Sequence, residues 1–154
     1  MKSRAHGFTL IEALIALAVL SLGLLGAAAM LLESMHAQGD SLRRGVATNL
    51  LRDMAERIRA NAAGAAHYAT SHAEAGASPC DVCDSAQLAA ADLAHFAAAA
   101  HAALPGESLA AIEFAPATGA AALNHFVISL RWQDPRADDA ETVTLQVLAL
   151  PVAG

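Results

Sequence analysis

The stretch Gly7–Leu32, with the sequence GFTLIEALIALAVLSLGLLGAAAMLL, decides the architecture of this chain. From Phe8 to Leu32 it runs for 25 residues that are nearly all apolar, and Glu12 is its one charged residue. A helix rises about 1.5 Å per residue, so a helix of this length spans a bilayer core of roughly 30 Å with some tilt. We therefore expect residues 8–32 to form a transmembrane helix.

The basic residues on either side of this stretch predict its orientation. Lys2 and Arg4 precede it, whereas the next basic residues, Arg43 and Arg44, come well after it. The positive-inside rule then places the N-terminus in the cytoplasm and residues 33–154 on the other side of the membrane.

An ordinary secretory signal peptide is the alternative interpretation of the same stretch. Ala27, Ala28 and Ala29 imitate an A-x-A cleavage site, and cleavage there would start the mature chain near Met30. The apolar run is, however, longer than the roughly 7–15 residues that are typical of a signal peptide.

The residues Gly7-Phe8-Thr9-Leu10-Ile11-Glu12 resemble the signature of the type IV pilin family. The resemblance implies that residues 1–7 are a leader, which prepilin peptidase removes by cutting between Gly7 and Phe8. It also implies N-methylation of Phe8 and a role for Glu12 in assembly. The protein would then be a single-pass protein of the bacterial inner membrane with a periplasmic domain, and the resemblance also allows its incorporation in a pilus.

Two further blocks, Ser21–Gly26 and Leu51–Asn61, resemble the PilV family of minor pilins. This implies a role in the complex that initiates a type IV pilus. The expected partners are other minor and major pilins, prepilin peptidase, the pilus assembly platform and the lipid of the inner membrane. A minor pseudopilin of a type II secretion system remains the alternative, and a membrane-tethered thiol oxidoreductase is a third.

Glu12 has a bland and a functional interpretation. The bland one is a tolerated acid that is protonated or reaches toward the headgroups. In the functional one, the Glu12 carboxylate pairs with the new α-amine of Phe8 on a neighbouring subunit, because two buried opposite charges cost much less together than apart. Intramembrane acids are rare and usually functional, which favours pairing.

The helix is expected to continue to about residue 60. One row of apolar residues recurs every four positions after Ser41. Three further apolar residues lie beside this row and widen it into an apolar stripe. The two groups are Leu42, Val46, Leu50, Met54 and Ile58, and Ala47, Leu51 and Ala55. Gly39 and Gly45 each cost about 1 kcal/mol against alanine and suggest a bend or a spot that can melt.

The remaining sequence predicts a loop over 61–84, a second helix over 85–104 and antiparallel strands within 109–150. Asp84 or Ser85 can cap that helix. The runs 109–115, 124–133 and 142–150 alternate in the manner of half-buried strands. The fold class is thus α+β, a long N-terminal helix packed on a small antiparallel sheet as in type IV pilins.

Cys80 and Cys83 are the two cysteines of the chain, and outside the cytoplasm a disulfide between them is the plain expectation. A redox motif would need a preceding strand in a parallel context, which is not visible. A metal site would need two more ligands, for which only the oddly spaced His67 and His72 are available.

Composition excludes several function classes. The net charge of −6 argues against a nucleic-acid surface, which needs a basic patch. The sequence shows neither a glycine-rich phosphate loop nor a serine, histidine and acid arrangement. We therefore expect no catalytic site, no cofactor and no metal.

Overall fold

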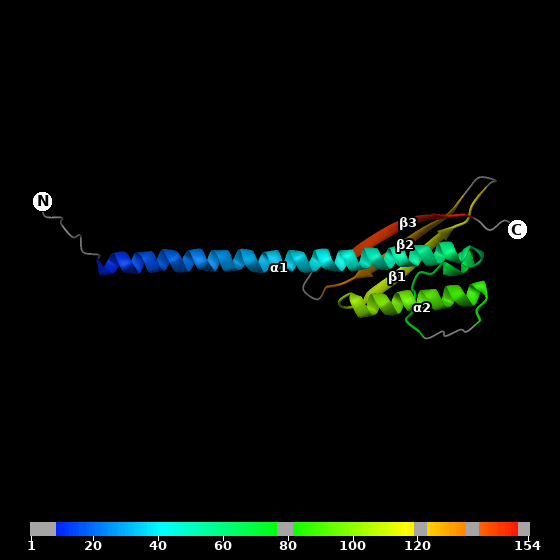
Figure 1. Cartoon of the computed structure of the whole chain (residues 1–154), viewed down its shortest axis with the longest axis horizontal. Helices are drawn as coiled ribbons and strands as arrows, with labels where there is room; N and C mark the ends of the chain where they lie inside the picture. The colour runs from blue at the N-terminus through cyan, green and yellow to red at the C-terminus, as the bar shows by residue number, and fades with distance from the viewer. Residues whose placement is uncertain (1–8, 77–81, 119–122, 135–138, 151–154) are drawn as a thin grey trace. The chain divides into compact units, whose positions relative to one another are not determined.

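The computed structural model describes residues 9–76, 82–118, 123–134 and 139–150. The chain divides into two compact units, residues 1–41 and 42–154. The boundary falls inside the helix α1 (Leu10–Ala60). The second unit also contains η1 (Ala62–Tyr68), α2 (Ser85–Ala103), β1 (Ser108–Ala115), β2 (Asn124–Trp132) and β3 (Glu141–Ala149) (Figure 1).

Helix α1 is unbroken across the two glycines that the sequence marks as weak points. A Cβ atom added at Gly39 or Gly45 would meet no other atom within 4 Å, so neither glycine serves a close contact. Each glycine therefore lowers the stability of the helix only through its poor helix propensity, and the hydrogen-bonded helix continues through both. The bend that they favour stays a prediction.

The buried side of α1 in the second unit differs from the predicted stripe. The buried residues are Ala47, Leu51, Met54, Ala55 and Ile58. By contrast, Leu42 is 70% exposed, while Val46 and Leu50 are only half-buried. A repeat of four drifts by about 40° per step around a helix of 3.6 residues per turn, so a strict i+4 row leaves the contact face. Residues spaced by a mixture of four and three positions stay on the contact face.

Helix α2 begins where the sequence predicts a cap. The Asp84 carboxylate accepts a hydrogen bond from the Gln87 amide at 2.7 Å, and the Gln87 side chain accepts one from the Asp84 amide at 3.1 Å. This capping box satisfies two backbone donors that the first turn leaves unpaired. The stretch predicted as a loop, 61–84, contains the 3-10 helix η1.

The three strands form an antiparallel meander in the order β1-β2-β3. Ile112 lies opposite Ile128, and Ile128 lies opposite Leu145. Alternate residues of β2 are buried from Asn124 to Trp132, as the period of two predicts. The predicted α+β architecture is therefore confirmed.

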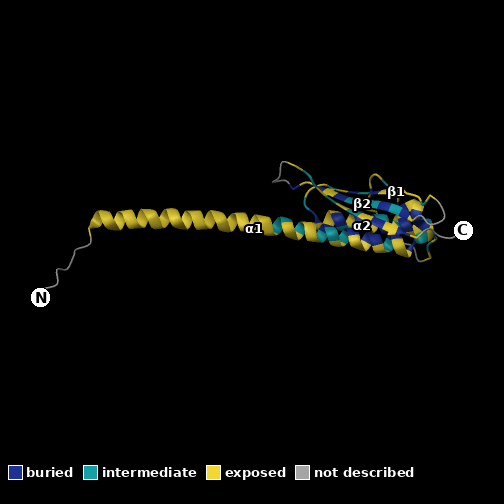
Figure 2. Ribbon diagram, turned by 90° about the horizontal axis from the view of Figure 1, so that it is seen from above, coloured by how far each residue is buried: buried dark blue, intermediate teal, exposed yellow. Residues whose placement is uncertain are grey.

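One face of the sheet and the helices form a single core. Its members come from α1, η1, α2 and all three strands, and the largest are Trp132, Tyr68, Phe126, Leu51 and Met54. Dark blue, buried residues gather where these elements meet in Figure 2. Alanine supplies much of the remainder.

A polar network crosses this core and joins α1, η1 and α2. The buried Asp92 carboxylate accepts hydrogen bonds from Arg57 Nη1 at 2.9 Å and from Tyr68 Oη at 2.7 Å. Asn61 Nδ2 lies 3.1 Å from Tyr68 Oη and donates to the Ser85 carbonyl at 2.8 Å. These hydrogen bonds hold α1, η1 and α2 together. They also satisfy polar groups that burial removes from water.

Gly64 permits this close approach. A Cβ atom there would lie 2.5 Å from both Asn61 Nδ2 and the Ser85 carbonyl oxygen. Any side chain at position 64 would therefore push η1 away from α2.

The network also shifts proton affinities. Burial, together with the hydrogen bond to Asp92, raises the pKa of Tyr68 above its usual value near 10. The hydrogen bonds to Asp53 and Asp92 raise the pKa of Arg57. Tyr68 is therefore neutral and Arg57 charged across the physiological range.

The two carboxylates on Arg57 provide a matched pair for mutation. Asp92 is buried, whereas Asp53, which accepts from Arg57 Nε at 2.8 Å, has a side chain 56% exposed. We expect Asp92→Asn to lower the free energy of unfolding by about 2 kcal/mol, because Arg57 and Tyr68 then lose the buried carboxylate to which they donate. Asp53→Asn should cost less than about 0.5 kcal/mol. Urea unfolding of both variants in detergent tests this, and equal losses would contradict it.

Alkaline pH provides a second test. Because the pKa of Tyr68 is raised in the folded state, the folded protein keeps a proton that the unfolded chain releases above about pH 10. Stability should fall by about 1.4 kcal/mol per pH unit above that point. Tyr68 is the only tyrosine, so tyrosinate absorbance reports it alone. Tyr68→Phe should remove this slope, and a slope that persists would contradict the assignment.

Candidate assembly and processing site

The first unit contains the apolar half of α1. Every residue from Leu10 to Gln38 is exposed, which Figure 2 shows as continuous yellow along this part of the helix. Its large exposed side chains include Leu10, Ile11, Leu14, Ile15 and Leu17. Among the described residues, α1 is the one helix long and apolar enough to cross a membrane. Apolar surface on all sides of a helix requires an apolar environment.

Glu12 lies in the first turn of α1. The Glu12 amide donates to the Thr9 carbonyl at 3.1 Å, which starts the helix one residue before Leu10. An acid in this turn complements the positive end of the helix dipole. The Glu12 side chain has no hydrogen bond or ion pair with another described residue.

The predicted cleavage point precedes this turn. Gly7 and Phe8 lie outside the described residues, so cleavage between them stays a prediction. Thr9, the first described residue, follows directly.

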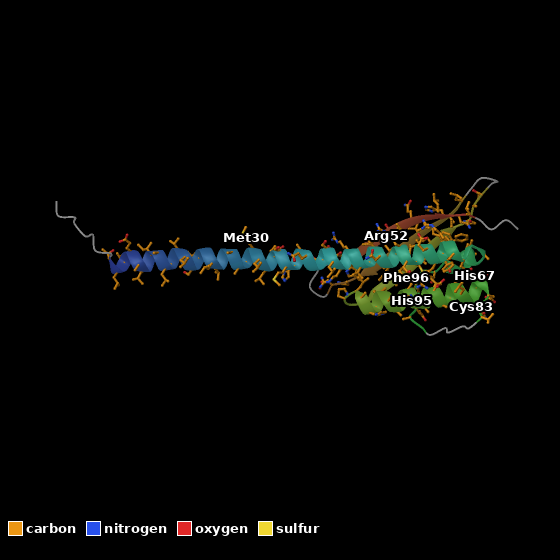
Figure 3. The ribbon with its side chains drawn as sticks, viewed as in Figure 1. Met30, Arg52, His67, Cys83, His95 and Phe96 are labelled. Carbon is orange, nitrogen blue, oxygen red and sulfur yellow. The ribbon has the colours of Figure 1, made fainter. Side chains whose placement is uncertain are left out.

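The cysteine pair is only partly described. Cys83 lies immediately before the cap residue Asp84, whereas Cys80 lies outside the described residues. The disulfide therefore stays a prediction. His67 is exposed on η1 and His72 is exposed beyond it, and Figure 3 labels Cys83 at the start of α2 and His95 further along the same helix. Within the described ranges, no cluster of three or more metal-ligating side chains occurs.

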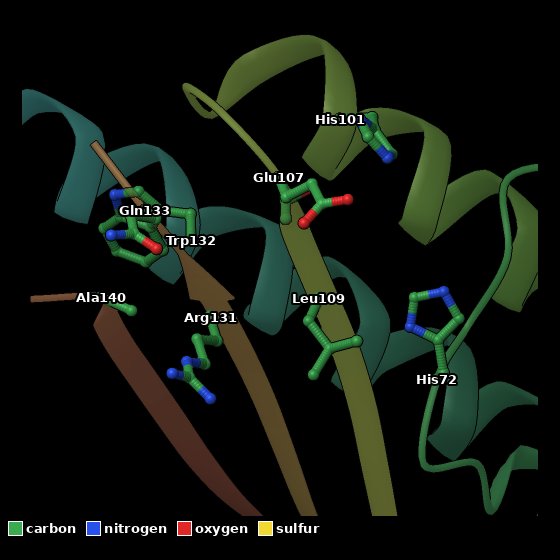
Figure 4. Close-up of a pocket in the computed structure, with 9 residues that line it drawn as sticks. His72, His101, Glu107, Leu109, Arg131, Trp132, Gln133 and Ala140 are labelled. Atoms are coloured by element: carbon green, nitrogen blue, oxygen red, sulfur yellow. The ribbon is translucent and has the colours of Figure 1, made fainter. Parts of the chain in front are cut away.

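A pocket of about 400 Å³ opens at one end of the sheet, and the sequence did not indicate it. Its charged and titratable lining residues are His72, His101, Glu107 and Arg131. Figure 4 shows them coming from the segment after η1, from α2, from the start of β1 and from β2. They are far apart in sequence and form no local motif, which is why sequence patterns missed them.

Two family comparisons match adjacent parts of the chain. The N-terminal profile, described as the prokaryotic N-terminal methylation motif, matches residues 2–28. The second, described as type IV pilin Tt1218, matches residues 29–99. No match was found among the curated proteins or among the solved structures.

These matches agree with the site described above. The methylation motif covers the predicted cleavage point and Glu12, and the pilin match covers the amphipathic half of α1 and most of α2. Pilins are structural, non-enzymatic proteins, which disfavours the thiol oxidoreductase alternative. The findings support a pilin or pseudopilin that is cut by prepilin peptidase, anchored by one helix and associated with other pilins. These matches and this architecture make the chain similar to type IV pilins over residues 2–99.

Proposed function

We propose that this protein is a minor pilin of the PilV kind, acting in the complex that initiates a type IV pilus. The observation that carries the proposal is Glu12, an acid in the first turn of the apolar part of α1 and within the methylation motif, which pairs with no other described residue. The block 51–61, which resembles PilV, favours the pilus over a type II secretion pseudopilin.

The proposed location is the inner membrane, with the N-terminus in the cytoplasm and the second unit in the periplasm. The basic residues nearest the apolar stretch agree with this orientation, because Lys2 and Arg4 lie six and four residues before Phe8, whereas Arg43 and Arg44 lie 11 and 12 residues after Leu32. In the second unit Arg43 pairs with Asp134, and Arg44 pairs with Glu141 at 2.9 Å. These arginines therefore serve the folded domain beyond the membrane.

Processing prepares the N-terminus for assembly. Cleavage between Gly7 and Phe8 gives Phe8 an α-amine, which is positive near neutral pH before and after a single methylation. Gly7 suits the junction because a residue without a side chain lets a peptidase approach the backbone closely. In this scheme prepilin peptidase is the enzyme and the assembly platform is the machinery. The chain is the substrate of both.

Glu12 then selects a neighbour at the correct axial position. In the bilayer its carboxylate costs about 2.5–3.5 kcal/mol on insertion scales, and a lone amine is similarly costly. Pairing the two across a subunit boundary relieves both. An unprocessed neighbour has no α-amine at Phe8 and cannot provide this pair.

The proposed pairing predicts the behaviour of Glu12→Ala. The variant should insert and be cut normally, but its incorporation into the assembly should fall at least about tenfold, since one ion pair of more than 1.4 kcal/mol is lost. Glu33→Ala is the matched control, because Glu33 is an exposed acid on the same helix but outside residues 8–32. Crosslinking to other pilins measures incorporation. Unchanged crosslinking of Glu12→Ala would sink the pairing mechanism.

The processing step has its own test. Intact mass and N-terminal sequencing of the protein from membranes should give a chain that begins at Phe8 and carries one added methyl group. Gly7→Leu should leave the full precursor, since a side chain obstructs the peptidase. A mature chain that begins near Met30 would identify a secretory signal peptide and remove the proposed function.

A further inference from the structure

Strand β3 has a free side. It is an edge strand of the sheet, and in the described part of the chain no strand lies on its other side. Its nine residues pair one-to-one with β2 from Glu141 to Ala149, without a bulge. The edge is therefore regular over its whole length.

The pairing pattern shows which backbone groups point outward from this edge. Ile112 exchanges both of its backbone hydrogen bonds with Thr70, at 2.8 and 2.9 Å, so it does not bond to Ile128 opposite it. Hydrogen-bonded and non-bonded pairs alternate in an antiparallel ladder. Ile128 therefore bonds to Leu145, and the N–H and C=O groups of Thr142, Thr144, Gln146 and Leu148 face away from the sheet.

The two edges of the sheet differ in how they are covered. The segment after η1 covers β1, where Thr70 pairs with Ile112 and the Ala73 amide donates to the Ala110 carbonyl at 2.8 Å. On β3, charged residues, proline and glycine are the usual devices that protect an edge, and the strand has one charged residue, Glu141 at its start, and no proline or glycine. An unprotected edge of this kind is the template that β-augmentation uses.

The helix beside this edge presents positive charge. Arg44 pairs with Glu141 of β3, so this side of α1 faces the strand. Thr48, Arg52 and Arg59 lie about 40°, 80° and 60° further round the helix than Arg44, on the flank between the β3 side and the exposed side. Arg59 pairs with Glu56, whereas Arg52 has no ion pair with another described residue. Figure 3 labels Arg52 on the part of α1 that runs along the sheet.

We infer that the edge of β3 binds an extended segment of a different protein chain, with an acidic side chain directed toward Arg52. The segment would bond to the four outward-facing residues of β3 and cover the half-buried Val143 and Leu145. A second copy of β3 fits less well, because its one acid, Glu141, already pairs with Arg44. This inference does not require the cleavage or the Glu12 pairing proposed above.

The test uses full-length protein in detergent and two fluorescent nine-residue peptides of alternating threonine and valine. One peptide has a central glutamate and the other a central lysine. We expect the glutamate peptide to bind about threefold more tightly, and Arg52→Glu to reverse that preference, as an exposed ion pair predicts. Fluorescence anisotropy measures both affinities, with empty micelles as the blank.

Variants at Thr144 locate the binding to the edge. Thr144→Pro removes an outward N–H without touching the bonds to β2, and it should weaken peptide binding at least about tenfold. Thr144→Val keeps that N–H and should bind as the wild type does. Gln146→Lys, which adds a charge at the edge, repeats the test if the proline variant does not fold.

Three results would overturn the inference. The first is the absence of binding by either peptide. The second is binding that ignores both Thr144→Pro and Gln146→Lys, or a preference that Arg52→Glu does not reverse. The third is a dimer of the protein alone that Thr144→Pro dissociates, because it would assign the edge to a second copy.

Discussion

A single helix must satisfy two environments, and the rest of the structure follows from that constraint. The first unit's part of α1 is apolar on every side, whereas residues 42–60 bury only one side. The first part gains stability from an apolar surrounding, and the second gains it from its own sheet. Glu12 is the one acid within residues 8–32, and residues 42–60 have their charges on the sides that face water, β3 or α2.

The second unit compensates for a core that is poor in aromatic residues. Aromatics make up 4% of the chain, and alanine occupies many of the buried helical positions. Small side chains allow close helix contacts but specify geometry weakly, because many arrangements pack equally well. The network of Arg57, Asp92, Tyr68 and Asn61 supplies the missing specificity, since its directional hydrogen bonds fit only one placement of α2.

Local patterns predicted the elements well and the contacts between them poorly. The alternation of β2 follows directly from a strand with one buried face, and the cap at Asp84 follows from a motif of four residues. The stripe on α1 was placed partly wrong, because a repeat of four drifts around the helix. Arg57 and Asp92 are 35 residues apart and each resembles a surface residue, so sequence patterns could not show their contact. Sequence patterns could not show which backbone N–H and C=O groups of β3 face away from the sheet either, because only strand order and pairing define them.

The order of the elements along the chain has a consequence for how the second unit folds. Each strand pairs with its neighbour in sequence, so the sheet closes only short loops. The α1 residues that share its core, such as Ile58, precede β2 by about 70 residues, and contacts over such separations form slowly. We therefore expect the helix to dock last, onto a sheet that is already paired. Until β2 is complete, a nascent chain carries a bare apolar stripe, and that interval is when the protein is most exposed to aggregation and proteolysis.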